Sequence, residues 1–129
     1  MIKLTVKNCY KLRDDFENVF ISKSEINITP KYDRLNLASR SVSSTRYDDV
    51  YIIEPECYYY VDFNEDVSQF AMKKNNKMGV LNIKNDLYES GLVMSFVAEQ
   101  NRLYIYNATK NIIYIEKEAM IGEVMTYGG

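Results

Sequence analysis

The feature that most constrains this fold is the alternation of apolar and polar residues between 103 and 125. Leu103 and Ile105 face one way and Tyr104 and Tyr106 the other, because successive side chains of a strand point to opposite sides. Polar residues interrupt the alternation twice, as expected of turns. The run therefore predicts three short strands, at 103–106, 112–116 and 120–125.

Strand periodicity recurs through the rest of the chain. Residues 2–7 alternate cleanly, and in 57–63 one face collects Cys57, Tyr59, Val61 and Phe63. Further strands are predicted at 25–29 with Ile26 and Ile28 inward, at 35–38, 50–53 and 78–83, and, fully buried, at 92–98. Polar loops are predicted at 39–49 and 84–90.

Two segments have helical spacing instead. Leu12, Phe16 and Val19 predict a short helix within 9–20. Asn64, followed by two carboxylates, predicts a helix that begins there and ends near Lys73 and Lys74. Many short strands with one or two short helices predict an all-β distorted barrel, with a two-sheet sandwich as the alternative.

Composition narrows the functional classes. The 129 residues fit one domain, 1–129, and the net charge of −2 disfavours a surface for duplex nucleic acid. The chain has no histidine, which excludes histidine-based triads and histidine-ligated zinc. Apolar runs are too short for a membrane helix, and the first residues do not resemble a signal peptide, so we expect a cytoplasmic protein with reduced Cys9 and Cys57.

Residues 107–125 resemble the last core strands of the family that unites dUTP diphosphatases with dCTP deaminases. That family has a strand ending in Asn, a turn, a strand and an Ile-Ala-Gln motif; here Asn107 lies fourteen residues before Ile121, which opens Ile-Gly-Glu. Shorter likenesses occur at 32–35, 50–55 and 77–80, so the resemblance covers about residues 24–125. It implies a dUTPase-like barrel of the β-clip type and a homotrimer with shared sites.

The resemblance also implies candidate site residues. Asp86, five residues before Gly91, has the spacing of the family's water-orienting Asp, and Tyr88 lies near the base-stacking aromatic position. The phosphate-binding Arg-Ser position reads Val67-Ser68 or, in another register, Met72-Lys73. The nucleotide-binding candidates are Ser68, Lys73, Lys77, Tyr88 and Gly91.

The same positions weaken the case for catalysis. The deaminase glutamate is replaced by Tyr104 or Phe96, which excludes deamination, and lysine in place of arginine lacks the bidentate fork. Asp86 is better explained as a loop carboxylate that caps a turn or faces water. Strand alternation favours Glu116, Glu118 and Glu123 as solvated strand edges rather than a metal site.

Three hypotheses follow. The first is a catalytically degenerate dUTPase-like protein, from a virus or mobile element, that acts as a binding or assembly module without a cofactor. The second is a divergent dUTP diphosphatase that uses Mg²⁺ and Asp86, and the third is an unrelated β-sandwich with a structural or carbohydrate-binding role. Tyr58, Tyr60, Tyr104 and Tyr106 alternate with buried positions and predict an interface, hence a homo-oligomer, with a deoxynucleotide or a protein as further partners.

Overall fold

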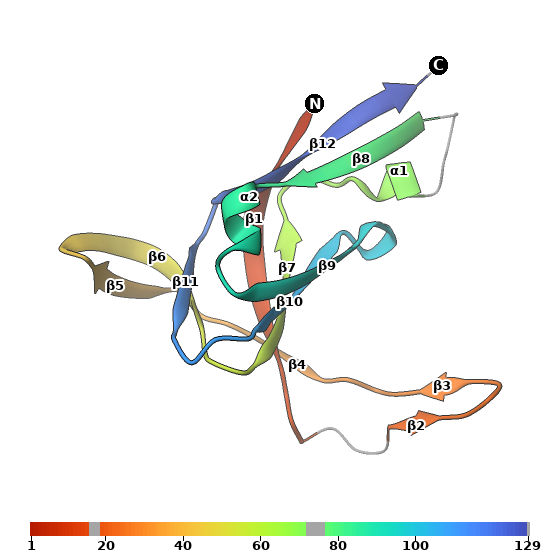
Figure 1. The fold of residues 1–129 in the computed structure, drawn as a ribbon, viewed down its shortest axis with the longest axis horizontal. Helices are drawn as coiled ribbons and strands as arrows, with labels where there is room; N and C mark the ends of the chain where they lie inside the picture. Colours follow the sequence, from red (N-terminus) through yellow and green to blue (C-terminus); the bar gives the residue numbers. More distant parts are fainter. Residues whose placement is uncertain (16–18, 72–76, 129) are drawn as a thin grey trace.

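A curled, mostly antiparallel sheet organises the computed structural model, which describes residues 1–15, 19–71 and 77–128 (Figure 1). Its strands run in the order β8–β12–β1–β7–β10–β9, and β4 pairs with the far end of β1. A second sheet has the order β11–β6–β5, and β2 and β3 form a separate hairpin. The curl makes a half-barrel, which confirms the predicted all-β distorted barrel.

The elements of the described residues have the following bounds. The strands are β1 (Ile2–Leu12), β2 (Phe20–Ile21), β3 (Ile26–Asn27), β4 (Tyr32–Arg34), β5 (Ala38–Val42), β6 (Thr45–Ile53), β7 (Tyr58–Phe63), β8 (Lys77–Ile83), β9 (Leu92–Val97), β10 (Arg102–Asn107), β11 (Ile113–Glu116) and β12 (Met120–Gly128). The helical segments are α1 (Ser68–Ala71), α2 (Asn85–Tyr88) and the 3-10 turn η2 (Ala98–Gln100). None of these helices is long and apolar enough to cross a membrane.

Strand β1 carries the bend of the sheet. Its first residues pair with β12, its later residues with β7, and its register shifts between Val6 and Cys9. Such a bulge bends a strand and increases its twist. Asn8 lies in the bulge. Its backbone amide donates a hydrogen bond to Asp62 Oδ1 at 2.7 Å, and its side-chain Oδ1 accepts one from the Arg34 guanidinium at 2.8 Å.

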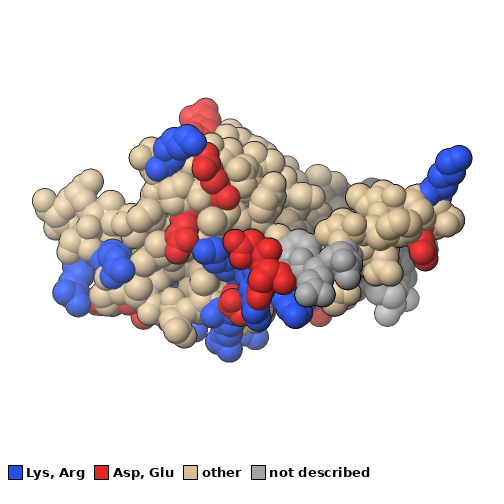
Figure 2. Space-filling model, turned by 90° about the horizontal axis from the view of Figure 1, so that it is seen from below, with Lys and Arg blue, Asp and Glu red and all other residues tan. Residues whose placement is uncertain are grey.

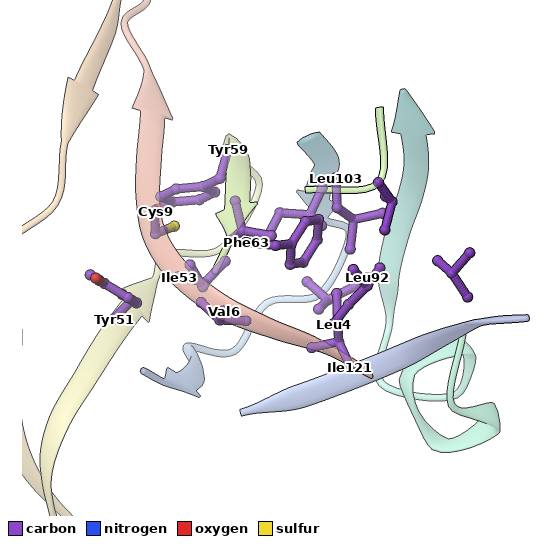
Figure 3. Packing of buried hydrophobic residues seen from close by; sticks show 14 residues of the cluster. Leu4, Val6, Cys9, Tyr51, Ile53, Tyr59, Phe63, Leu92, Leu103 and Ile121 are labelled. Atoms are coloured by element: carbon purple, nitrogen blue, oxygen red, sulfur yellow. The ribbon is translucent and has the colours of Figure 1, made fainter. Parts of the chain in front are cut away.

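The core lies on the concave side of the sheet (Figure 3). Every second residue of β7 and β10 points into it, as the alternation predicted. Apolar side chains from five strands meet there at 7% exposure or less: Leu4, Val6, Ile53, Tyr59, Val61, Phe63, Leu103, Ile105, Ile121 and Val124. The polar end of Tyr59 is satisfied, because its hydroxyl accepts the Glu54 amide at 2.8 Å.

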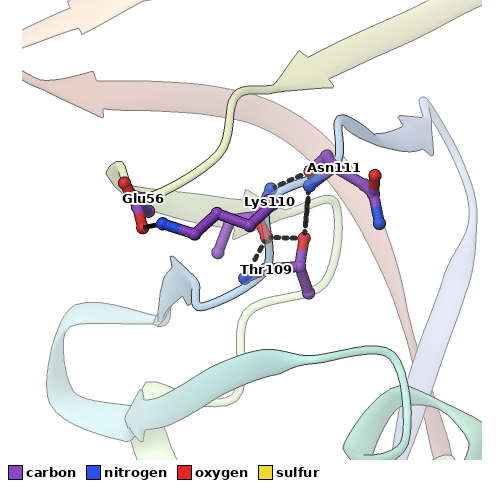
Figure 4. A network of polar contacts seen from close by, with 5 residues as sticks. Glu56, Thr109, Lys110 and Asn111 are labelled. Atoms are coloured by element: carbon purple, nitrogen blue, oxygen red, sulfur yellow. Dashed lines mark hydrogen bonds and ion pairs between the residues drawn. The ribbon is translucent and has the colours of Figure 1, made fainter.

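A buried asparagine fastens the turn after β10. Asn107 is fully buried, and its Nδ2 donates to the carbonyls of Ile53 and Asn111. Its Oδ1 accepts both the amide and the hydroxyl of Thr109, at 3.0 and 2.7 Å. Lys110, in the same turn, pairs with Glu56 of the β6–β7 connection (Figure 4). The predicted turn is thus confirmed and joins β10 to β6.

The helix predicted within 9–20 is wrong where the structure describes it. Residues 9–12 continue β1 and pair with both β7 and β4, so sheet pairing overrides the helical spacing. Phe16 lies outside the described residues. The strand predicted at 25–29 shrinks to β3, and its inward assignment is wrong because Ile26 is 70% and Ile28 43% exposed.

Other sequence predictions fail at turns. The loop predicted at 39–49 is the β5–β6 hairpin, whose turn residues Ser43 and Ser44 adopt positive φ. The strand predicted at 35–38 falls instead on 32–34 and 38–42. Short helix α2 occupies the polar loop predicted at 84–90.

The predicted second helix and buried strand also need correction. Helix α1 begins at Ser68, not at Asn64, whose side chain bonds Thr5 and Glu118. The acceptor at its start is Asp66: its Oδ1 accepts from the Ser68 hydroxyl at 2.7 Å and from the Ser68 amide at 2.9 Å, and these hydrogen bonds lower the Asp66 pKa. In β9 only Leu92 is fully buried, because this is an edge strand of the sheet.

Candidate functional site

The residues implied by the family resemblance do not all gather in one place. Asp86 and Tyr88 lie on α2, beside β9, and Gly91 follows in the same connection. Ser68 starts α1, and α1 and α2 lie near opposite ends of β8 (Figure 1). Lys73 lies outside the described residues, as does Lys74.

The α2 segment has few features of a catalytic centre. Asp86 is exposed, and its carbonyl caps the helix by accepting the Glu89 amide. Tyr88 is 62% exposed. Among the residues that the structure describes, no group of three or more Asp, Glu, Cys or His could hold a metal ion.

Gly91 has a clear backbone role. Its φ is +91°, a conformation that glycine adopts without steric cost. A Cβ on Gly91 would lie 2.2 Å from Thr109 Cγ2, and the Gly91 carbonyl accepts the Ala108 amide at 3.1 Å. The glycine thus lets the α2–β9 connection approach the Asn107 turn.

The most distinctive surface is the convex side of the sheet, opposite the core. We define the outer tyrosine face as Tyr10, Tyr32, Tyr58, Tyr60, Tyr104 and Tyr106, together with Arg102. Four strands contribute to it: β1, β4, β7 and β10. The alternation that buries Tyr59 and Val61 directs Tyr58 and Tyr60 outward.

The rings of this face stack against one another in two groups. Tyr60 stacks on Tyr10 with ring centroids 4.6 Å apart, meets Tyr32 edge-on at 4.7 Å and packs against Tyr104 at 5.7 Å. Tyr58 and Tyr106 stack at 4.4 Å. These partners are direct neighbours in the sheet, since Tyr60 pairs with both Tyr10 and Tyr104.

Arg102 adds a fixed positive charge. Its guanidinium lies 4.2 Å from the centre of the Tyr60 ring, within the range of a cation–π contact. The Tyr104 hydroxyl accepts from Arg102 and donates to Gln100 at 2.7 Å. The hydrogen bond from Arg102 to Tyr104 raises the Arg102 pKa, and burial raises the pKa of Tyr60. Both groups therefore keep their charge states at neutral pH.

Mutual stacking limits what the face can recognise. Ring faces that contact one another cannot also stack on a base or a sugar, so the group centred on Tyr60 offers mainly ring edges and hydroxyls. Tyr58 is different because it is 56% exposed; its neighbour Tyr106 is half-buried, and Val93, the partner of Tyr106 in β9, is 60% exposed. A rigid aromatic surface with an arginine is typical of protein–protein contacts.

A cleft of about 720 Å³ opens beside Tyr58, at the end of β1 and β7. Charged side chains line it, and several are paired: Arg13 bonds Asp15 and lies 3.9 Å from Asp33, and Lys11 bonds Glu54 at 2.9 Å. Cys57 also lines the cleft. A partner that covers Tyr58 would therefore meet a mixed-charge rim.

Both cysteines are free, as predicted. Cys9 is fully buried, and burial raises the pKa of its thiol to about 12, so it is unreactive at neutral pH.

No protein-family model matches this sequence, and no curated protein matches it.

Sequence reasoning identified four of the six tyrosines of the outer face. Tyr58, Tyr60, Tyr104 and Tyr106 follow from strand alternation. Tyr10 and Tyr32 were missed because their place depends on the pairing of β1 with β7 and β4. Arg102 extends the same alternation by one step before Tyr104 and could have been included on that ground.

Proposed function

We propose that this chain is a non-catalytic binding or assembly module and that the outer tyrosine face is its contact surface. The observation that carries the proposal is the outer tyrosine face itself: two groups of packed tyrosine rings on the convex side of the sheet, one of which also holds Arg102. Large rigid side chains lose little conformational entropy on binding, and tyrosine and arginine dominate the energetics of many interfaces. The partner is a protein surface, because ring edges and hydroxyls are presented rather than open ring faces.

In its specific form, the proposal is a homo-oligomer that forms through this face, with three copies as the number implied by the family resemblance. A degenerate relative of the dUTP diphosphatases would keep the barrel and the assembly while losing the chemistry. The exposed position of Asp86 supports that reading.

Sedimentation over a concentration series tests the proposal with a matched pair of variants. Tyr58 and Tyr88 are similarly exposed, at 56% and 62%, but only Tyr58 belongs to the outer tyrosine face. Tyr58→Asp is expected to weaken association roughly a hundredfold, since a charge replaces a central aromatic contact. Tyr88→Asp is expected to leave it unchanged. Equal behaviour of the two variants, or self-association insensitive to both, would overturn the proposal.

A ligand experiment separates the module from the diphosphatase. The thermal midpoint is measured with and without saturating dUTP and Mg²⁺, where specific binding at one hundred times Kd would add about 2.7 kcal/mol of stability. We expect no shift. A clear shift that is lost in Asp86→Ala would restore the nucleotide site and contradict the non-catalytic assignment.

A further inference from the structure

The β2–β3 hairpin and its connections form an arm that leaves the body of the molecule (Figure 1). We define the arm as residues 19–31. Its turn is closed by the Ser22 amide, which donates to the Glu25 carbonyl at 2.8 Å. At the other end the Arg13 amide donates to the Lys31 carbonyl at 2.8 Å, which ties the arm to the end of β1.

One face of the arm is apolar. Ile21 and Ile26 pair directly across the hairpin and are both 70% exposed. Val19 and Ile28 flank the two strands, two positions from Ile21 and Ile26, and are 53% and 43% exposed; continuing the alternation past the strand ends places them on the same face. We call these four residues the arm strip. Phe20 and Asn27 pair on the opposite face.

Such a strip is unusual in an isolated molecule. A two-stranded hairpin is marginally stable in water by itself, and becomes stable when its apolar face packs against another layer. Contiguous apolar patches of more than a few hundred Å² on a soluble surface usually mark an interface. The arm strip thus has the properties of a surface that another molecule covers.

Charges flank the strip at both ends. The turn carries Lys23 and Glu25, and the junction with the body carries Asp14 on the β2 side and Lys31 on the β3 side. All four residues are exposed. Figure 2 shows the largely uncharged arm between charged side chains at its tip and at its junction with the body.

We propose that the arm is a homotypic docking surface, in which two copies of this chain pack their arm strips face to face and antiparallel. A two-fold axis across the strands puts the tip of each arm over the base of the other. Lys23 of one copy then lies over Asp14 of the other, and Glu25 lies over Lys31, so opposite charges meet on both sides. A parallel arrangement would bring Lys23 over Glu25, but it would also place the two bodies over each other at the same end of the contact, whereas the antiparallel arrangement keeps them at opposite ends.

The same pattern favours a second copy over an unrelated protein. The strip itself is aliphatic, so it is complementary to itself, and the charges at its tip are matched by opposite charges at the base of the same arm. An isologous contact uses every favourable pair twice. With less than about 800 Å² per partner, the contact is expected to be weak and concentration-dependent. This inference goes beyond the tyrosine-face proposal because the two surfaces share no residue.

Cross-linking tests the antiparallel register. With Lys31 over Glu25, Ile28 lies at the two-fold axis and meets its own copy. In a Cys57→Ser background, where the remaining Cys9 is buried, Ile28→Cys is compared with Asn27→Cys on the opposite face, using a short bismaleimide. We expect covalent dimer to form at least about tenfold faster from Ile28→Cys, because docking raises the effective concentration of that thiol. Equal rates would overturn the inference.

Sedimentation equilibrium tests the strip itself. Ile26→Ser is compared with Phe20→Ser, which removes a comparably exposed apolar side chain from the opposite face. Ile26→Ser is expected to raise the Kd of the arm contact by roughly a hundredfold or more, since each dimer loses two buried isoleucines, while Phe20→Ser leaves it unchanged. Equal effects of the two substitutions would overturn the inference, as would a Tyr58→Asp protein that stays monomeric at every concentration.

The Tyr58→Asp protein separates this inference from the tyrosine-face proposal, since it retains the arm contact alone. Flotation with neutral phosphatidylcholine vesicles tests a lipid surface as the alternative occupant of the arm strip. Vesicle binding by that protein, lost in Ile26→Ser and without self-association, would assign the arm to a lipid surface and contradict the homotypic contact. Absence of vesicle binding together with self-association is the expected result.

Discussion

The body of the molecule, formed by the curled sheet and the β11–β6–β5 sheet, and the arm use the same residue types in opposite ways. Ile53 of β6 is fully buried, whereas Ile21 and Ile26 of the arm are 70% exposed. In the body, strands from both sheets share one core; in the arm, two short strands pair with each other. The difference indicates that the body folds by its own packing, while the arm becomes a complete layer only with a second molecule.

The largest expected difference between the two regions comes from one substitution made in both. Ile53→Ala should lower the free energy of unfolding by about 3–4 kcal/mol, because it leaves a cavity in a closely packed core. Ile26→Ala should change it by less than about 0.5 kcal/mol in dilute protein, because an exposed side chain loses little. Denaturant unfolding at low concentration measures both. Similar losses at the two positions would mean that the arm packs against its own body.

Side-chain hydrogen bonds of Asn107 should also stabilise the body. Asn107→Ala removes four side-chain hydrogen bonds and leaves buried backbone groups without partners, so a loss of about 2–3 kcal/mol is expected. Asn111→Ala is the control, because Asn111 contributes only its backbone carbonyl and amide to this network. A neutral Asn107→Ala in chemical denaturation would show that the turn does not hold β10 to β6.

Gly91 should be less sensitive than Asn107 but still intolerant of a side chain. Gly91→Ala forces an alanine to φ +91° and places its Cβ against Thr109, with an expected cost of about 2 kcal/mol. Adding Thr109→Ser removes the clashing methyl group while keeping the hydroxyl, so the double variant should recover part of that stability. If Gly91→Ala had the same thermal midpoint as the parent protein, the close approach of the α2–β9 connection to the Asn107 turn would be wrong.

The smallest expected effect is a pH dependence of the body. Burial raises the pKa of Tyr59 in the folded chain. Unfolded tyrosine loses its proton first, so stability is fully present below the unfolded pKa of about 10 and falls as the pH rises above it. Unfolding free energies measured from about pH 8 to pH 11 should fall less steeply in Tyr59→Phe than in the parent. Identical slopes would contradict the burial of this hydroxyl.

Strand alternation predicted the structure of the body far better than that of the arm. In β7 and β10 apolar core residues alternate with outward-facing residues that are mostly less buried, so a period of two is visible directly in the sequence. The segment after Cys9 has helical spacing, yet its place is decided by pairing with β7 and β4, which are distant in sequence. The inward assignment of Ile26 failed because an apolar residue was assumed to be covered by its own chain.

The candidate site was predictable to a similar extent and for the same reason. Alternation gave the outward tyrosines of β7 and β10, but the full face depends on which strands become neighbours. The residues chosen by family resemblance, such as Asp86 and Ser68, rested on short matches and lie on separate helical segments. Local pattern thus predicted faces, whereas the assembly of a surface required the sheet order.

Hydrogen–deuterium exchange at several protein concentrations tests the contrast between body and arm most directly. Amides of β7 and β10 should exchange slowly at every concentration, because the body is stable by itself. Amides at Ser22 and Ile26 of the arm should exchange rapidly in dilute protein and become protected as the concentration rises. Arm amides with the same protection at every concentration, whether high or low, would contradict an arm that is completed by a second copy.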